Sequence, residues 1–274
     1  MSYATLMVHV DLDDESSGRV KVAADLAERF RAHLVGVAGW APMSVFLAEE
    51  ARSDPAASES HLQDMRAMLD QRGKAFRAAV AKSDAQAEWR AVLDYPTEVV
   101  AREARAADLV IIGNTRESKD PFRALDPGQL LLKVGRPVLV VPHGVASLVP
   151  RRVAIAWKDI REARRAVRDA LPFLQQAESV MVVEILEQGS VDQATHHVND
   201  VARYLARHGI EIIAERVRPA DVTAANALVR MIEDENINLI VAGAYGHSRL
   251  GEWAFGGVTR DLLAESPVCC LLSH

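Results

Sequence analysis

The stretch Ile237-Asn-Leu-Ile-Val-Ala-Gly-Ala-Tyr-Gly246 indicates how this chain folds. Its apolar run predicts a buried strand that leads directly into a loop beginning Gly243-Ala-Tyr-Gly246. Nine residues later the chain reads Gly256-Gly257-Val258-Thr259, and a helix is predicted from Val258 to Glu265. A strand, a glycine loop and a helix N-terminus in this order are typical of a phosphate site. Glycine lets backbone N–H groups approach an anion, and the helix dipole attracts negative charge.

The same alternation of apolar runs and helical stretches occurs twice along the chain. In the first half, strands are predicted at 4–10, 33–40, 89–93, 109–112 and 137–142, and helices at 18–31, from about 60 to 81, and at 96–106. In the second half, strands are predicted at 152–157, 180–185, 210–217, 237–242 and 267–272, and helices at 162–175, 193–207, 221–235 (capped by Asp221) and 258–265. Two positions mark the repeat, since Gly113 corresponds to Gly243 and Pro137 to Pro267 at the same offset.

Short apolar strands that alternate with longer helices predict parallel sheets covered on both faces, a doubly wound α/β fold. A length of 274 residues fits two such domains, which we place at 1–144 and 151–274. The linker runs from Pro142 to Pro150 and is short. In this fold class ligands bind at the carboxyl ends of the strands, where the strand order reverses.

Net charge, apolar runs and cysteine content exclude several classes of function. A formal net charge of -6 argues against nucleic acid as the main partner. No apolar run approaches the roughly 18 residues of a membrane span, and the first residues do not read as an export signal. Cys269 and Cys270 are adjacent and are the only cysteines, so no cross-linked framework is expected within a chain. These features predict a cytoplasmic protein with no membrane partner.

The spacing G-x-x-G, nine residues, G resembles the nucleotide-binding motif of the ATP-binding branch of the universal stress protein family. In that motif the last glycine is followed by Ser or Thr. The resemblance covers nearly the whole chain in two copies. It implies two tandem Rossmann-like domains, each a five-stranded parallel sheet of order 3-2-1-4-5 with helices on both faces. It also implies a stress-response regulator that binds ATP or a related adenine nucleotide, with or without Mg²⁺. A homodimer whose chains each pack their two halves together is the expected assembly.

The candidate nucleotide-binding residues all lie in the second half: Trp157, Lys158, Gly243, Gly246, His247, Ser248, Arg249, Gly256, Gly257, Val258 and Thr259. The first two loop glycines would leave room for ribose and phosphate, the backbone of 256–258 would donate N–H groups, and Thr259 would add a hydroxyl. The family has Ser or Thr where Gly257 stands, so one hydroxyl is missing. Because a charge-assisted hydrogen bond contributes roughly 1.5–3 kcal/mol, we expect weaker ATP binding.

Two parts of this candidate site have alternative readings. Many family members carry an Asp where Lys158 stands, which puts adenine recognition in question. Lys158 could meet a phosphate while Trp157 stacks on a base, or the two could be an exposed lysine and a core tryptophan. The loop side chains of 247–249 could clamp phosphate, Arg249 in bidentate fashion, or could be solvated.

The first half carries a degraded version of the loop. Arg116 replaces the second glycine, and Asp126-Pro127 stands at the helix entrance, where a carboxylate repels phosphate. We therefore expect this half to supply structure and interface. Alternatively, Arg116 and Arg123 could bind a different anion. Asp11 is retained at the end of the first strand.

No catalytic motif is recognisable. His196-His197 is expected on a solvated surface, and His9 in the core or an interface. One alternative function is slow ATP hydrolysis or self-phosphorylation, with Thr259 or Ser248 near the γ-phosphate. Another is a nucleotide-free module whose two halves pair through their last strands and which then dimerises.

Overall fold

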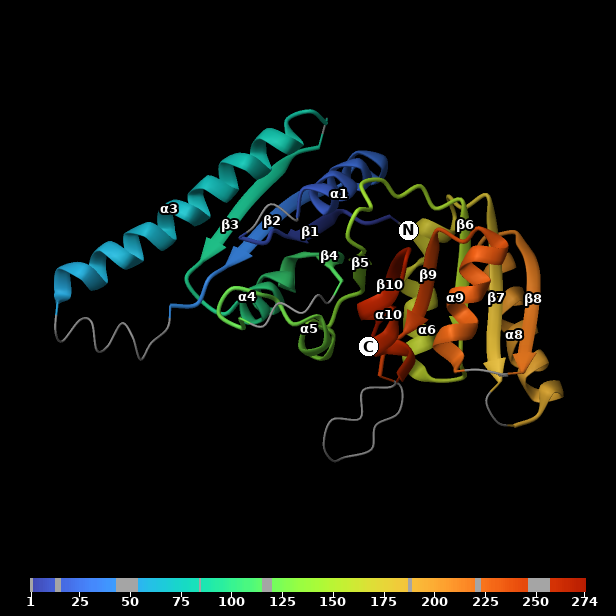
Figure 1. The fold of residues 1–274 in the computed structure, drawn as a ribbon. Helices are drawn as coiled ribbons and strands as arrows, with labels where there is room; N and C mark the ends of the chain where they lie inside the picture. Colours follow the sequence, from blue (N-terminus) through green and yellow to red (C-terminus); the bar gives the residue numbers. More distant parts are fainter. Residues whose placement is uncertain are drawn as a thin grey trace. The chain divides into compact units, whose positions relative to one another are not determined.

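The computed structural model describes residues 2–12, 16–42, 54–83, 85–114, 120–186, 189–219, 223–245 and 257–274, with the backbone alone at 55, 214–216, 218 and 219. The chain forms two compact units. One unit comprises residues 3–134, and the other comprises residues 135–274 together with residues 1–2. Both are α/β units with a largely parallel sheet (Figure 1), so the predicted doubly wound α/β class is confirmed.

The described residues of the unit 3–134 form four parallel strands in the order β3-β2-β1-β4. They are β1 (Thr5–His9), β2 (His33–Gly39), β3 (Ala87–Val92) and β4 (Leu109–Gly113). Its helices are α1 (Ser17–Phe30), α3 (Pro55–Val80), α4 (Pro96–Glu103), the 3₁₀ turn η2 (Ala104–Ala106) and α5 (Pro127–Lys133). Helix α1 packs against α3, and α4 packs against α5.

In the unit of residues 135–274, the part that the structure describes forms six strands in the order β5-β10-β9-β6-β7-β8. They are β5 (Val138–Val141), β6 (Arg152–Trp157), β7 (Ser179–Leu186), β8 (Ile212–Pro219), β9 (Leu239–Gly243) and β10 (Cys269–Ser273). From β8 to β10 all neighbours are parallel and follow the predicted order 3-2-1-4-5. Strand β5, which the sequence assigns to the first domain, pairs antiparallel with β10.

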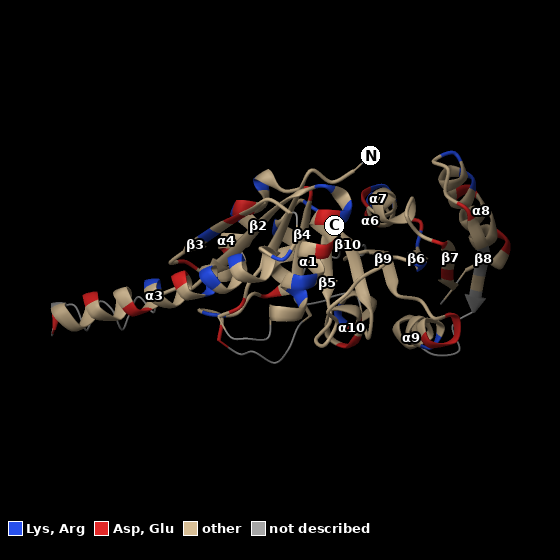
Figure 2. Ribbon diagram, turned by 90° about the horizontal axis from the view of Figure 1, so that it is seen from above, with Lys and Arg blue, Asp and Glu red and all other residues tan. Residues whose placement is uncertain are grey.

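Helices cover both faces of this second sheet. Figure 2 shows α6 (Arg161–Asp169), α7 (Leu171–Leu174) and α8 (Val191–Ala206) on one face, and α9 (Ala224–Glu235) and α10 (Gly257–Glu265) on the other. The central strands β6, β9 and β10 are therefore buried on both sides. Their near-continuous apolar sequences follow from this burial, because neither face of the strand meets water.

Two helix boundaries differ from the sequence prediction because of local capping. Helix α3 begins at Pro55, within a stretch expected to be irregular. Asp54 makes this start possible, since its Oδ1 accepts hydrogen bonds from the N–H groups of Ala56 (3.1 Å) and Ala57 (3.2 Å). Helix α9 is capped by Thr223, which accepts from the N–H of Asn226 (3.3 Å). The expected cap Asp221 lies outside the described residues.

The helix predicted at 162–175 is two helices in the structure. Helix α6 ends at Asp169, and the short α7 starts at Leu171. Pro172 stands in the first turn of α7 and has no N–H to donate to a preceding carbonyl, which explains the interruption. None of the described helices combines the length and the apolar character that a bilayer span requires.

Candidate functional site

The strand order of the second unit reverses between β6 and β9. These two strands are parallel neighbours, with Ala156 opposite Ala242, and their carboxyl ends therefore lie at the same edge of the sheet. The helix after β6, α6, lies on one face of the sheet, and the helix after β9, α10, lies on the other (Figure 2). This is the switch point at which doubly wound folds bind ligands, and it is where the sequence places the glycine loop.

The two ends of the glycine loop meet beside β9. The N–H of Tyr245, two residues after the strand, donates to Oγ1 of Thr259 in the first turn of α10, at 3.3 Å. Thr259 is only 5% exposed, so this contact is shielded from water. The backbone N–H groups of Gly257, Val258 and Thr259, at the start of α10, therefore lie close to the carboxyl end of β9. The predicted Gly246, His247, Ser248, Arg249 and Gly256 lie outside the described residues, and their roles stay predictions.

The two described loop glycines have different surroundings. At Gly257 a Cβ atom would meet no described residue within 4 Å, so as far as these residues go the position has room for the hydroxyl that the family motif carries there. At Gly243 a Cβ would lie 2.5 Å from the backbone N of Ala163 and 2.7 Å from the carbonyl carbon of Glu162. The first turn of α6 occupies that side of Gly243, and close packing explains the glycine. Its predicted role in leaving room for ribose stays a prediction.

Trp157 and Lys158 end strand β6. Trp157 is 8% exposed, and within the described part of the chain its buried indole Nε1 has no hydrogen-bond partner. Lys158 is exposed. These exposures match the reading of a core tryptophan beside an exposed lysine, and a contact of either residue with a nucleotide stays a prediction.

The expectation for His197 is wrong. His196 is 70% exposed, as expected, but His197 is only 24% exposed because this side of α8 packs onto β7. Its Nδ1 lies 3.8 Å from Oε2 of Glu184, the residue opposite Trp157 on the neighbouring strand. Burial raises the pKa of the Glu184 carboxyl, and the charge of His197 opposes this shift. The described residues contain no group of three or more His, Cys, Asp or Glu side chains that could hold a metal ion.

In the first unit, the space beside Gly113, the counterpart of Gly243, is filled by a side chain. Arg19 of α1 is 7% exposed, its Nε donates to the carbonyl of His9 (2.9 Å), and its guanidinium is paired with Asp11. The same guanidinium occupies the position that a Cβ on Gly113 would take. His9 is buried on β1, in agreement with the expected core histidine. Sequence reasoning missed Arg19, whose only signal is one arginine in the first turn of a predicted helix.

The helix that follows this loop in the first unit is capped by a carboxylate. Oδ1 of Asp126 accepts from the N–H of Gln129 at 3.0 Å, at the N-terminus of α5. A negative charge therefore already stands where a phosphate would have to bind. Arg123 stacks over the ring of Trp40, with 4.9 Å between its Cζ and the ring centroid. Arg116 lies outside the described residues.

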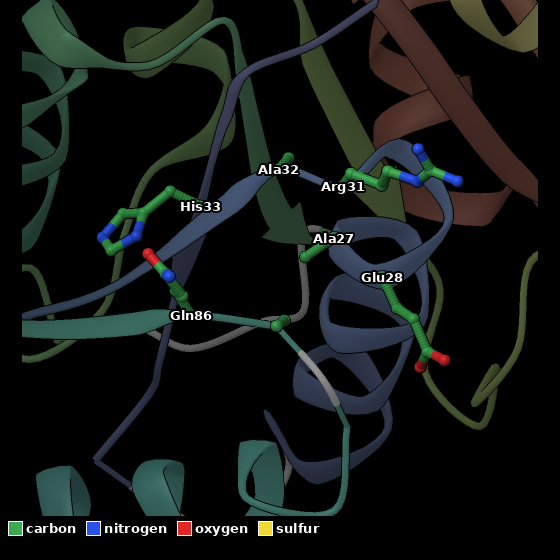
Figure 3. Close-up of a pocket in the computed structure, with 7 residues that line it drawn as sticks. Ala27, Glu28, Arg31, Ala32, His33 and Gln86 are labelled. Atoms are coloured by element: carbon green, nitrogen blue, oxygen red, sulfur yellow. The ribbon is translucent and has the colours of Figure 1, made fainter.

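An open hollow of about 510 Å³ lies elsewhere in the first unit, at the amino ends of β2 and β3. It is lined by Ala27, Glu28, Arg31, Ala32, His33, Ala85 and Gln86. Figure 3 shows the side chains of His33 and Gln86 close together, whereas those of Arg31 and Glu28 point away from them. Because doubly wound folds bind ligands at the carboxyl ends of strands, this hollow is separate from the predicted type of site.

Comparison with known proteins identifies the type of domain. Residues 150–274 match the model of the universal stress protein family. The whole chain is similar in structure to a universal stress protein from Archaeoglobus fulgidus, with a TM-score of 0.75 and 15% identity, covering 98% of this chain and 95% of that one. It is also similar to a functionally unknown protein from Pseudomonas aeruginosa, with a TM-score of 0.62 and 14% identity, covering 99% of this chain and 92% of that one. At these identities the structures show the fold alone. No curated protein shows a significant sequence match to the chain.

Proposed function

We propose that residues 150–274, which match the model of the universal stress protein family, bind ATP or a related adenine nucleotide and that the protein is a nucleotide-responsive regulator of stress responses. The two copies of the domain are residues 1–144 and 151–274, and the second copy holds the ligand. The proposed setting is the cytoplasm, where the buried thiols of Cys269 and Cys270 stay reduced.

The observation that carries this proposal is the hydrogen bond that joins the two ends of the glycine loop. Tyr245 and Thr259 are 3.3 Å apart from N to Oγ1, so the end of β9 and the first turn of α10 are in contact at the switch point. Backbone N–H groups at a helix start, with the positive end of the helix dipole behind them, favour phosphate. Oγ1 of Thr259 accepts from Tyr245, and its hydroxyl proton remains to donate to a phosphate oxygen.

The contrast between the two units supports one nucleotide per chain. In the second unit the start of α10 has room beside Gly257. In the first unit the carboxylate of Asp126 caps α5, the helix at the corresponding place. A polyphosphate there would have to approach a negative charge, which costs free energy. We propose that any Mg²⁺ enters with the nucleotide, bound through the phosphates.

Calorimetric titration of the full chain with ATP tests the proposal. The expected result is one site per chain, with stabilisation of about 2.7 kcal/mol when ATP is present at about 100 times its Kd. Titration with GTP determines whether the site prefers adenine. Product analysis of the same samples distinguishes occupancy from slow hydrolysis.

A matched pair of variants connects the binding to the proposed site. Thr259→Val removes the proposed phosphate donor and should weaken ATP binding about tenfold or more, because the lost hydrogen bond is to a charged group. Thr195→Val makes the same change on an exposed turn of α8, where the hydroxyl donates to the carbonyl of Val191, and should leave the affinity unchanged. Wild-type protein that neither binds ATP nor gains stability from it would refute the proposal.

A further inference from the structure

The peptide unit between Ala244 and Tyr245 is held at both of its polar ends. Its carbonyl oxygen lies 3.1 Å from Nδ1 of His274, the residue after β10. Its N–H donates to Oγ1 of Thr259 at 3.3 Å. Because a trans peptide is planar and its C=O and N–H point in opposite directions, a single rigid group connects His274 to Thr259.

The backbone at Tyr245 needs such support. Its φ of 58° lies in the left-handed region, which costs a residue with a side chain roughly 1–2 kcal/mol. Conformations of this kind persist where surrounding contacts determine them. Here the contacts are the two hydrogen bonds to the peptide and an edge-on packing of the Tyr245 and His274 rings, with 6.1 Å between centroids.

His274 is itself fixed by residues of other elements. Its backbone O atom accepts a hydrogen bond from Nη1 of Arg165, on α6, at 2.8 Å. The preceding residue, Ser273, donates its hydroxyl to Oδ2 of Asp169, at the end of α6, also at 2.8 Å. The N–H of Ala244 donates to the carbonyl of Ser273 at 2.8 Å and continues the pairing of β9 with β10 beyond the strands. The imidazole therefore approaches the 244–245 peptide from a rigid support.

Resting on the proposed nucleotide function, we propose that His274 is a positioning residue of the phosphate site and acts through the 244–245 peptide on the hydroxyl of Thr259. The carbonyl of Ala244 can only accept, so the ring must carry a proton on Nδ1 to bind it. With its oxygen held, the peptide presents its N–H to Thr259 and polarises that hydroxyl, whose proton points on to a phosphate oxygen. Loss of the His274 contact lets the peptide turn, and Thr259 then loses its orientation.

The test uses the full chain and two substitutions at one position. His274→Ala removes the donor, whereas His274→Asn keeps a side-chain N–H close to the place of Nδ1. His274→Ala should shift the backbone amide resonance of Tyr245 and weaken ATP binding about three- to tenfold, the loss expected for one hydrogen bond. His274→Asn should retain both the resonance and the affinity within about twofold. Urea unfolding of each variant checks that the fold is intact.

A double-mutant cycle decides whether His274 acts through Thr259. In the Thr259→Val background, His274→Ala should cost no further affinity, because the hydroxyl that it positions is already gone. Additive losses, or an unchanged Tyr245 resonance in His274→Ala, would overturn the inference while the nucleotide function stands. A wild-type chain that binds no ATP would instead overturn the proposed function, and with it the ligand assigned to this positioning role.

Discussion

Replacing Gly243 by alanine tests how tightly α6 packs on β9. The new Cβ would stand 2.5 Å from the backbone N of Ala163, 2.7 Å from the carbonyl carbon of Glu162 and 3.0 Å from the Cα of Ala163. These atoms belong to helix backbone and cannot rotate away, so the first turn of α6 would have to move by about 0.9 Å to restore an ordinary contact of about 3.4 Å. Forced displacement of this kind costs about 1–3 kcal/mol, and we expect the upper half of that range.

Gly257→Ala is the matched control. Within the described part of the chain a Cβ there meets nothing within 4 Å, and the residue is the first of α10. Alanine favours a helix over glycine by up to about 1 kcal/mol, so this substitution should leave the free energy of unfolding unchanged or raise it slightly. The assay is urea unfolding followed by tryptophan fluorescence, in which Trp157 reports on the same unit.

For the reasoning to hold, Gly243→Ala must lower the free energy of unfolding and Gly257→Ala must not. If the free energy of unfolding of Gly243→Ala lay within about 0.5 kcal/mol of the wild-type value, the close approach of α6 to β9 would be refuted, because changes this small are typical of exposed positions. A Gly257→Ala chain destabilised as strongly as Gly243→Ala would show that the space beside Gly257 is not open.

Three further predictions concern the rest of the molecule. Arg31→Gly removes a left-handed residue (φ 53°) at the end of α1 and should raise the free energy of unfolding by about 1 kcal/mol, so a lowered urea midpoint would contradict it. Burial alone would raise the pKa of the Asp11 carboxyl, but the charges of Arg19 and His9 and the Arg19 hydrogen bond bring it below the ordinary 3.8. The ionised carboxyl therefore contributes stability that is present above pH 3.8 and lost as pH falls through the lower folded-state pKa, and Asp11→Asn should abolish this dependence in acid unfolding curves. Burial raises the pKa of Cys269 and Cys270 to about 12, so both thiols should resist iodoacetamide in the folded chain at about pH 8 and react in denaturant, as counted by mass spectrometry.

The strands were predictable because their burial shows in the sequence. A strand covered on both faces, such as β9 or β10, must be apolar throughout, and such runs stand out between polar helices. Which strand a given strand pairs with does not show in its own sequence in the same way. The run at 137–142 predicts β5, but its pairing with β10 appears only in one alternative, a module whose two halves pair through their last strands, and the antiparallel direction does not follow from those residues. Similarly, Pro55 reads as irregular unless the carboxylate of Asp54 is recognised as a cap.

The candidate site was likewise predictable only in part. The spacing of its glycines and the start of α10 follow from local sequence. The contacts that define its surroundings join residues distant in sequence, as His274 does when it binds the carbonyl of Ala244. The same holds in the first unit, where Arg19 fills the space beside Gly113. Gly243 shows the limit most clearly. Its motif position suggests a ligand, whereas the nearest atoms are those of a helix that begins about 80 residues earlier.

The antiparallel pairing of β5 with β10 has a consequence for how the two copies can evolve. When two identical chains associate, every substitution appears in both, and a side chain that seals one pocket seals its twin. Here the edge of β10 is taken by a strand of the same polypeptide, so no second chain is needed to complete it. The two copies can then change independently, so that a carboxylate caps the helix after the loop in one copy, as Asp126 does at α5, while the start of α10 in the other carries none in its first turn.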